Sequence, residues 1–144
     1  MKKIPLLLLT ILFFSCYTET HKNRPSDKAA AGIVAESLFF AMERSDYNGL
    51  SDLFDHKFLE ITPAEKIPEM LAQMKQEMGS LQSFELVFSR TKVSEGSVQS
   101  GEYYLEYECE FEKRKGKWTI TMAKSEDGII RILGYTLNLA PEKR

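Results

Sequence analysis

The sequence has few cysteines, no excess of positive charge and no long apolar run. Its two cysteines allow at most one disulfide, and none if one of them carries a lipid, so packing has to stabilise the fold. Its 19 Lys and Arg residues are outnumbered by 21 Asp and Glu residues, which argues against a nucleic-acid-binding protein. The longest apolar run, Ile4 to Phe14, is shorter than the roughly 20 residues that cross a bilayer.

The beginning of the chain has the layout of an export signal. Lys2 and Lys3 form a charged segment before the short apolar run, as in secretory signal peptides. An ordinary signal-peptidase site needs small residues one and three positions before the cut. Ser15 meets the first requirement, whereas Phe13 fails the second.

The segment Leu12-Phe13-Phe14-Ser15-Cys16 resembles a bacterial lipobox, although Phe13 stands where leucine is usual. This resemblance implies that residues 1–15 are removed and that Cys16 is acylated, with palmitate as an attached chain. The alternative is a signal peptide that is cut elsewhere and leaves an unmodified thiol. Because two or more acyl chains hold a protein stably on a membrane, we expect a lipid-anchored lipoprotein of a bacterial cell envelope. The inner and the outer membrane both remain open.

The rest of the chain has the length of one domain. Loss of Lys2 and Lys3 leaves 17 basic residues against 21 acidic ones, a net charge of −4. Residues 16–25 are polar without periodicity, and we expect a tether there. Residues 26–140 then form a single domain, and residues 141–144 form a C-terminal tail. Cys109 has no partner and fits a buried, inert thiol.

Helical signals dominate the first half of the domain. The first helix is expected from Ser26 or Asp27 to about Arg44, and a short second helix over Asp46 to Phe54. Thr62-Pro63-Ala64-Glu65 has the pattern of a capped helix start, and Gly79 that of a helix end. Pro68 should kink this third helix or move its start to a later residue.

The second half alternates between apolar and polar residues, which is typical of strands. We expect strands over Ser83 to Val93, over Glu102 to Glu112, around Trp118, and over Ile129 to Leu139, the last with a bulge or at an edge. Phe84, Leu86 and Phe88 should share one face of the first strand. The fold class is therefore α+β, with N-terminal helices packed on a curved four-stranded antiparallel sheet.

The second strand separates two kinds of side chain most clearly. Its inner face should carry aromatic and aliphatic residues, and its outer face Glu106, Glu108, Glu110 and Glu112. We expect these glutamates to be solvated and paired with Arg90, Lys92 and Lys117. Alternate strand residues lie roughly 7 Å apart, too far for several to bind one calcium ion, so no metal is predicted. Repulsion between two such faces predicts a monomer, or a dimer through another surface.

The order of elements adds a family resemblance. Gly79-Ser80-Leu81 closing the last helix, Tyr103 to Phe111 in mid-sheet and Gly134-Tyr135 in the last strand are similar to the nuclear-transport-factor-two-like, or cystatin-like, cone. More narrowly, Lys28 to Leu139 resembles small uncharacterised bacterial lipoprotein domains of that fold. The resemblance implies a conical cavity between sheet and helices. Its candidate lining is an aromatic band on the inner face, which otherwise forms core: Tyr103, Tyr107, Phe111 and Trp118.

Three functions follow as hypotheses. The first is a binding module for a partner protein or a small apolar ligand, without a cofactor. The second is an acid/base enzyme that uses Asp52 or Asp55 with His56, which requires these side chains to project into the cavity beside Tyr107 or Trp118. The third is a purely structural envelope component. No catalytic residue is assigned.

Overall fold

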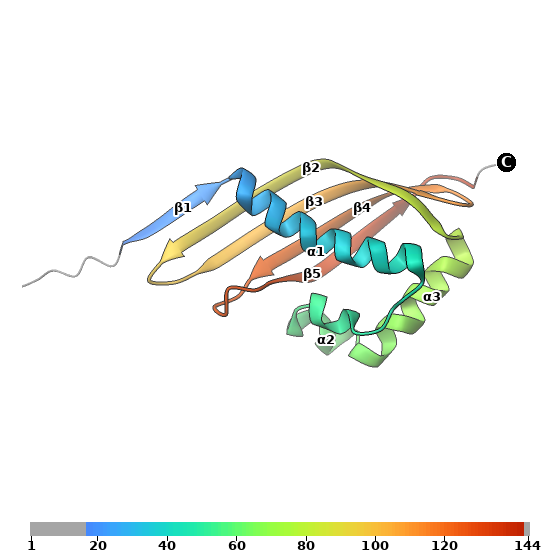
Figure 1. Cartoon of the computed structure of the whole chain (residues 1–144), viewed down its shortest axis with the longest axis horizontal. Helices are drawn as coiled ribbons and strands as arrows, with labels where there is room; N and C mark the ends of the chain where they lie inside the picture. The colour runs from blue at the N-terminus through green and yellow to red at the C-terminus, as the bar shows by residue number, and fades with distance from the viewer. Residues whose placement is uncertain (1–16, 143–144) are drawn as a thin grey trace, which may run out of the picture.

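The computed structural model describes residues 17–142, so the lipobox and Cys16 lie outside the described residues. Five antiparallel strands form one sheet in which spatial order follows chain order, and the helices pack against one face of it (Figure 1). The expected α+β class, with helices that precede and cover an antiparallel sheet, is confirmed. The sheet has five strands rather than four and is not strongly curled.

The long helix α1 (Pro25–Arg44) begins with a proline, whose fixed φ suits a first helical position, and ends at Ser45 in the left-handed conformation. A 3₁₀ turn, η1 (Leu50–Leu53), replaces the expected second helix. The six-residue helix α2 (His56–Ile61) follows, in a segment where no helix was expected.

A second 3₁₀ turn, η2 (Ala64–Lys66), precedes helix α3 (Ile67–Met78). The delayed start confirms the predicted effect of Pro68, which lies in the first turn of α3. Gly79 ends α3 with a φ of 80°, as its position predicted. A side chain there would also collide with Glu112, because a Cβ would lie 2.6 Å from that residue's Cβ.

The four expected strands are β2 (Leu81–Gly96), β3 (Ser100–Phe111), β4 (Lys115–Lys124) and β5 (Ile130–Leu139). The additional strand β1 (Thr18–Lys22) lies within the segment expected to be a tether. It pairs with β2 from Thr18 opposite Gly96 to Lys22 opposite Lys92. Backbone hydrogen bonds hold an exposed edge strand in place without an apolar face, so its sequence lacked the usual signal.

The described sheet has three register shifts, two in β2 (at Leu81/Ser83 and at Leu86/Phe88) and one between β4 and β5. In β5, Thr121 pairs with Gly134 while Met122 pairs with Ile132, which leaves Leu133 as the extra residue and confirms the predicted irregularity. In β2, Leu86 lies opposite Tyr107 and Phe88 opposite Glu106. The extra residue Val87 therefore places Leu86 and Phe88 on opposite faces, which corrects the expectation that they share one.

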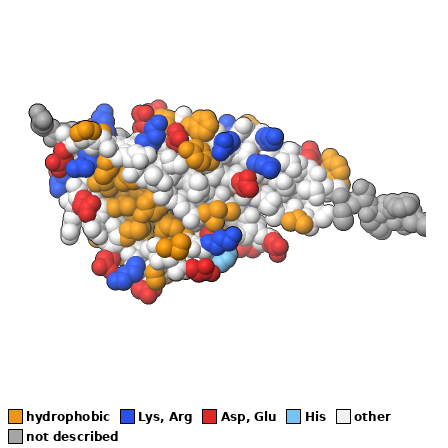
Figure 2. All heavy atoms as spheres, turned by 180° about the vertical axis from the view of Figure 1, so that it is seen from behind, with side chains coloured by type: hydrophobic (Ala, Val, Ile, Leu, Met, Phe, Trp, Pro, Cys, Tyr) orange, Lys and Arg blue, Asp and Glu red, His pale blue; other side chains and the backbone are white. Residues whose placement is uncertain are grey.

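The hydrophobic core lies between the helices and the inner face of the sheet. In β3 alternate residues are buried, from Tyr103 to Phe111, as the sequence predicted. Three small residues of α1, Ala31, Gly32 and Ala35, are also buried and let this helix lie close to the sheet. Figure 2 shows the molecule from the opposite side, where hydrophobic side chains gather in a patch left of the centre of the view.

Candidate functional site

The aromatic band lies inside the core. Tyr103, Tyr107, Phe111 and Trp118 are each at most 2% exposed. The ring of Phe39, on α1, lies 4.8 Å from that of Tyr107 and 5.3 Å from that of Trp118, between ring centroids. Tyr107, Phe111 and Trp118 line none of the three cavities described below, whereas Tyr103 lines one. In this arrangement the band packs against α1.

Three polar atoms of the band have no hydrogen-bond partner within the described residues: the hydroxyls of Tyr103 and Tyr107 and the indole N–H of Trp118. Burial raises the pKa of Tyr103 to about 12 and that of Tyr107 further. A Cβ on Gly32 would lie 4.0 Å from the Tyr107 hydroxyl, so α1 closes the space next to it. The Tyr107 hydroxyl would therefore reach a small ligand only if α1 moved away.

The suspected acid/base group lies at the surface. Asp55 is buried, and its Oδ1 accepts a hydrogen bond of 3.0 Å from the Lys57 N–H, which makes it the N-cap of α2. His56 Nδ1 lies 3.0 Å from the same oxygen, but the His56 side chain is 73% exposed. Asp52 is exposed as well.

These residues share a surface hollow of about 630 Å³ with the β4–β5 turn, residues 125–129, and with Arg131. Neither Tyr107 nor Trp118 lines it. The arrangement required for the enzyme hypothesis is therefore not formed. No cluster of three or more potential metal ligands occurs between residues 17 and 142.

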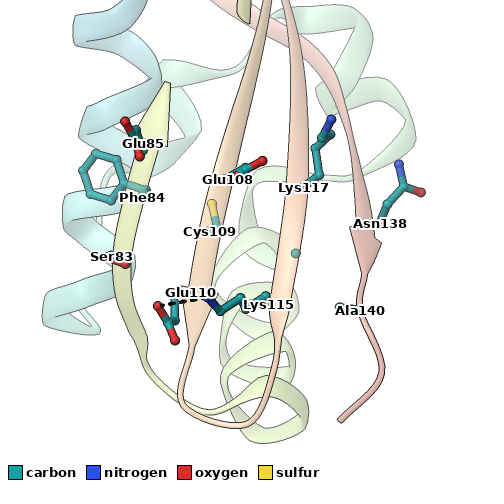
Figure 3. A pocket seen from close by; sticks show the side chains of 11 residues that line it. Ser83, Phe84, Glu85, Glu108, Cys109, Glu110, Lys115, Lys117, Asn138 and Ala140 are labelled. Atoms are coloured by element: carbon teal, nitrogen blue, oxygen red, sulfur yellow. Dashed lines mark ion pairs between the residues drawn. The ribbon is translucent and has the colours of Figure 1, made fainter. Parts of the chain in front are cut away.

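The outer face of the sheet is hollowed across β2, β3, β4 and β5 into a trough of about 740 Å³ (Figure 3). Its charged lining residues are Glu85, Glu108, Glu110, Lys115 and Lys117. Lys115 lies 3.8 Å from Glu110, and Lys117 lies 3.7 Å from Glu106, which confirms the predicted pairing of Lys117. The charges largely compensate one another, as in an ordinary solvated face.

A further hollow of about 550 Å³ lies nearer β1 and is lined by Lys22, Arg90, Lys92 and Tyr104, among others. Arg90 was expected to pair with a glutamate. Its guanidinium instead lies over the Tyr104 ring, 5.4 Å from the centroid. Cation–π contacts of this kind stabilise an exposed arginine by about 0.5–1 kcal/mol.

An ion-pair network joins the beginning of α1 to the end of β2. Arg24 donates two hydrogen bonds of 2.9 Å to the buried Asp27, and others of 2.5 and 3.3 Å to Glu95. His21 Nε2 lies 3.6 Å from Glu95. The two carboxylates raise the pKa of Arg24, and Arg24 lowers the pKa of Glu95. Because these groups saturate one another, we interpret the network as a structural clamp.

The free edge of β2 is the most unusual surface. β1 covers residues 92–96, and Asn23 hydrogen-bonds both the N–H and the carbonyl of Thr91. Residues 81–90 of β2 therefore pair with β3 alone within the described chain. Leu86, Val87 and Phe88 are 40%, 43% and 49% exposed there. Phe40 of α1, 43% exposed, continues this surface through a ring contact of 5.4 Å with Phe84.

Sequence reasoning did not single out this edge. The three consecutive apolar residues from Leu86 to Phe88 interrupt the alternation of β2, and that interruption was the available signal. No protein-family model matches the chain, and no curated protein is significantly similar to it.

Proposed function

We propose that this chain is a lipid-anchored, exported binding module of a bacterial envelope, which holds an extended segment of a partner protein along the free edge of β2. The observation that carries the proposal is that residues 86–88 combine exposed apolar side chains with a backbone that has a neighbouring strand on one side only. Strand addition uses both features, since the backbone supplies hydrogen bonds and the side chains supply specificity.

The environment of this edge supports the proposal further. Natural proteins protect exposed edge strands with charges, prolines or bulges. Here β2 has a bulge at Val87, but the three residues at the bulge, Leu86 to Phe88, are apolar, and the nearest charges on the strand are those of Glu85 and Arg90. Five of the ten large hydrophobic side chains that are exposed between residues 17 and 142 belong to β2 or α1: Ile33, Phe40, Leu86, Val87 and Phe88.

A partner protein fits better than a small apolar ligand. The aromatic band that would line a ligand pocket is buried against Phe39 and the small residues of α1. A ligand would have to displace this helix, whereas a peptide at the β2 edge would meet side chains that are already exposed. The nuclear-transport-factor-two-like resemblance is compatible with either role, since one fold serves many functions.

The membrane attachment belongs to the same proposal and depends on acylation of Cys16. Between residues 17 and 142, no helix has both the length and the apolar character needed to cross a bilayer. Replacement of Cys16 by alanine should abolish labelling by radioactive palmitate and move the protein out of the membrane fraction. Unchanged labelling and fractionation would contradict the anchor.

Site-specific photocrosslinking in cells tests the edge. We expect a photoreactive residue at Val87 to give a discrete adduct, and the same residue at Ile61, 85% exposed on α2, to give none. The additional change Phe88→Lys should remove the adduct, because a lysine opposes pairing at an edge, whereas Ile61→Lys should leave it. Equal adducts at both positions, or none, would refute the edge site. A small molecule retained in native mass spectrometry of residues 17–144 would favour the ligand alternative.

A further inference from the structure

The strand β1 leaves almost no chain between the sheet and the proposed anchor. Only Tyr17 separates Cys16 from Thr18, the first residue of β1. Successive Cα atoms are about 3.8 Å apart, so Thr18 lies within about 8 Å of the acylated residue. A nine-residue tether from Tyr17 to Pro25, as expected from the sequence, would have lifted the domain clear of the lipid headgroups. With Cys16 acylated, the observed strand would instead keep this end of the sheet at the membrane surface.

Two turns lie at the same end of the molecule (Figure 1). Thr18 pairs with Gly96, the last residue of β2, and a Cβ on Gly96 would lie 2.2 Å from the Tyr17 carbonyl oxygen. The β2–β3 turn, residues 97–99, follows at once. The β4–β5 turn lies beside it, since a Cβ on Gly128 would be 3.8 Å from Gln99 Oε1.

Each of these three neighbouring segments exposes one large apolar side chain. Tyr17 is 71% exposed, Val98 is 60% exposed and Ile129 is 50% exposed. Exposed apolar residues on a soluble surface are common one at a time. Here three stand at the end of the sheet where the lipid would begin, and tyrosine is a residue enriched at membrane interfaces.

From this geometry we infer that the end of the sheet formed by Tyr17, Val98 and Ile129 rests in the interface of the lipid bilayer. The inference rests on the proposed acylation of Cys16 and adds an orientation to it. Phe88 lies eight residues along β2 from Gly96. At about 3.3 Å per residue, the free edge of β2 would stand roughly 26 Å from the membrane-facing end, where a partner can reach it.

The charges at this end indicate an apolar contact rather than an electrostatic one. Asp127 is bound to Arg131 at 2.8 Å, and Glu95 is bound to Arg24. Glu126 is exposed on the β4–β5 turn, and Lys124 lies next to that turn. With acidic and basic groups both present, we expect the contact to depend little on ionic strength, in contrast to a polybasic segment.

Depth-dependent quenching tests this orientation. The lipidated protein would carry a single fluorophore on Val98→Cys, Ile129→Cys or the control Ile61→Cys, in phosphatidylethanolamine–phosphatidylglycerol vesicles with brominated acyl chains. Cys109 is buried and its pKa is raised to about 12, so it should not compete for the label. We expect labels at 98 and 129 to be quenched at least threefold more than the label at 61, at both low and high salt.

Two checks separate the possible failures. Mass spectrometry and vesicle flotation first establish acylation, and a protein that is not acylated and does not float contradicts the proposed function. An acylated, floating protein whose three labels are quenched equally, or not at all, overturns the orientation alone. If labels at 98 and 129 were quenched more than the label at 61 only at low salt, the contact would be electrostatic, and the inferred apolar contact would be overturned.

Discussion

The two faces of β3 have opposite environments although their residues alternate along one strand. The inner residues, from Tyr103 to Phe111, are nearly inaccessible, and the outer residues include glutamates that line an open trough. Burial of a large apolar side chain contributes about 1.5–3 kcal/mol, whereas an exposed ion pair contributes about 0–1 kcal/mol. The inner face should therefore determine stability, and the outer face should be tolerant of substitution.

The largest expected effect is on the inner face. Trp118→Ala removes a fully buried indole and should lower the free energy of unfolding by about 3–5 kcal/mol. Thr136→Ala, at an exposed position in β5, is the matched control and should change it by less than about 0.5 kcal/mol. Urea unfolding followed by circular dichroism measures both. Similar losses for the two variants would contradict the division between the faces.

The second-largest loss of stability is expected when the ion-pair network around Arg24 is disrupted. Arg24→Gln leaves the buried Asp27 without its cationic partner and should lower the urea midpoint. Arg44→Gln, at the exposed end of α1, removes the same charge and should have a smaller effect. Equal midpoints for the two variants would mean that the network does not hold α1 to β2.

The same clamp should make stability depend on pH. Because Arg24 lowers the folded-state pKa of Glu95, their interaction is fully stabilising above the unfolded value of about 4.3 and is lost as the pH falls through the folded value. Unfolding measured from pH 6 to pH 3 should therefore show a steeper loss for the wild type than for Arg24→Gln. Lowered pKa values at Glu69 and Asp127 affect both proteins equally and cancel in this comparison.

The thiol of Cys109 reports the accessibility of the inner face without disturbing it. Burial raises its pKa to about 12, so a Cys16→Ser protein should react with an aromatic disulfide reagent only as it unfolds. The reaction should follow the urea transition seen by circular dichroism. Rapid reaction of the native protein at pH 8 would indicate that the inner face opens locally.

The smallest effect is expected on the outer face. Glu108→Gln should change the free energy of unfolding by less than about 0.5 kcal/mol, since Glu108 is exposed. Sedimentation velocity should give the same coefficient for this variant and the wild type, as expected for a monomer or for a dimer formed elsewhere. A dimer whose contact is centred on Glu108 would refute this prediction.

The parts of the fold that could be predicted are those with a local cause. The alternation from Tyr103 to Phe111 required one wet and one buried face, and Gly79 and Pro68 set the limits of α3 through backbone conformation. Strand β1 and helix α2 were missed because an edge strand needs no apolar face and six residues make too short a pattern. The placement of Leu86 and Phe88 on opposite faces was missed because the bulge at Val87 changes the alternation of side chains along β2.

The candidate functional residues likewise include features that the sequence predicted and features that only the packing of the helices decides. Sequence identified the aromatic band as an apolar surface, but only the small residues of α1 decide that a helix covers it rather than a ligand. It also identified His56 and the neighbouring aspartates as titratable. Their distance from the core depends on α2, whose cap uses Asp55.

By itself, the sequence determined the class of fold, the two faces of β3 and the lipobox resemblance at Cys16, because each depends on residues close together in the chain. The tertiary structure decided that β1 shortens the connection to that cysteine and that residues 81–90 of β2 are left with one neighbouring strand. Both outcomes depend on where β1 ends along β2. The paired residues of these two strands are 70 to 78 positions apart in the sequence, and no local pattern encodes such a pairing.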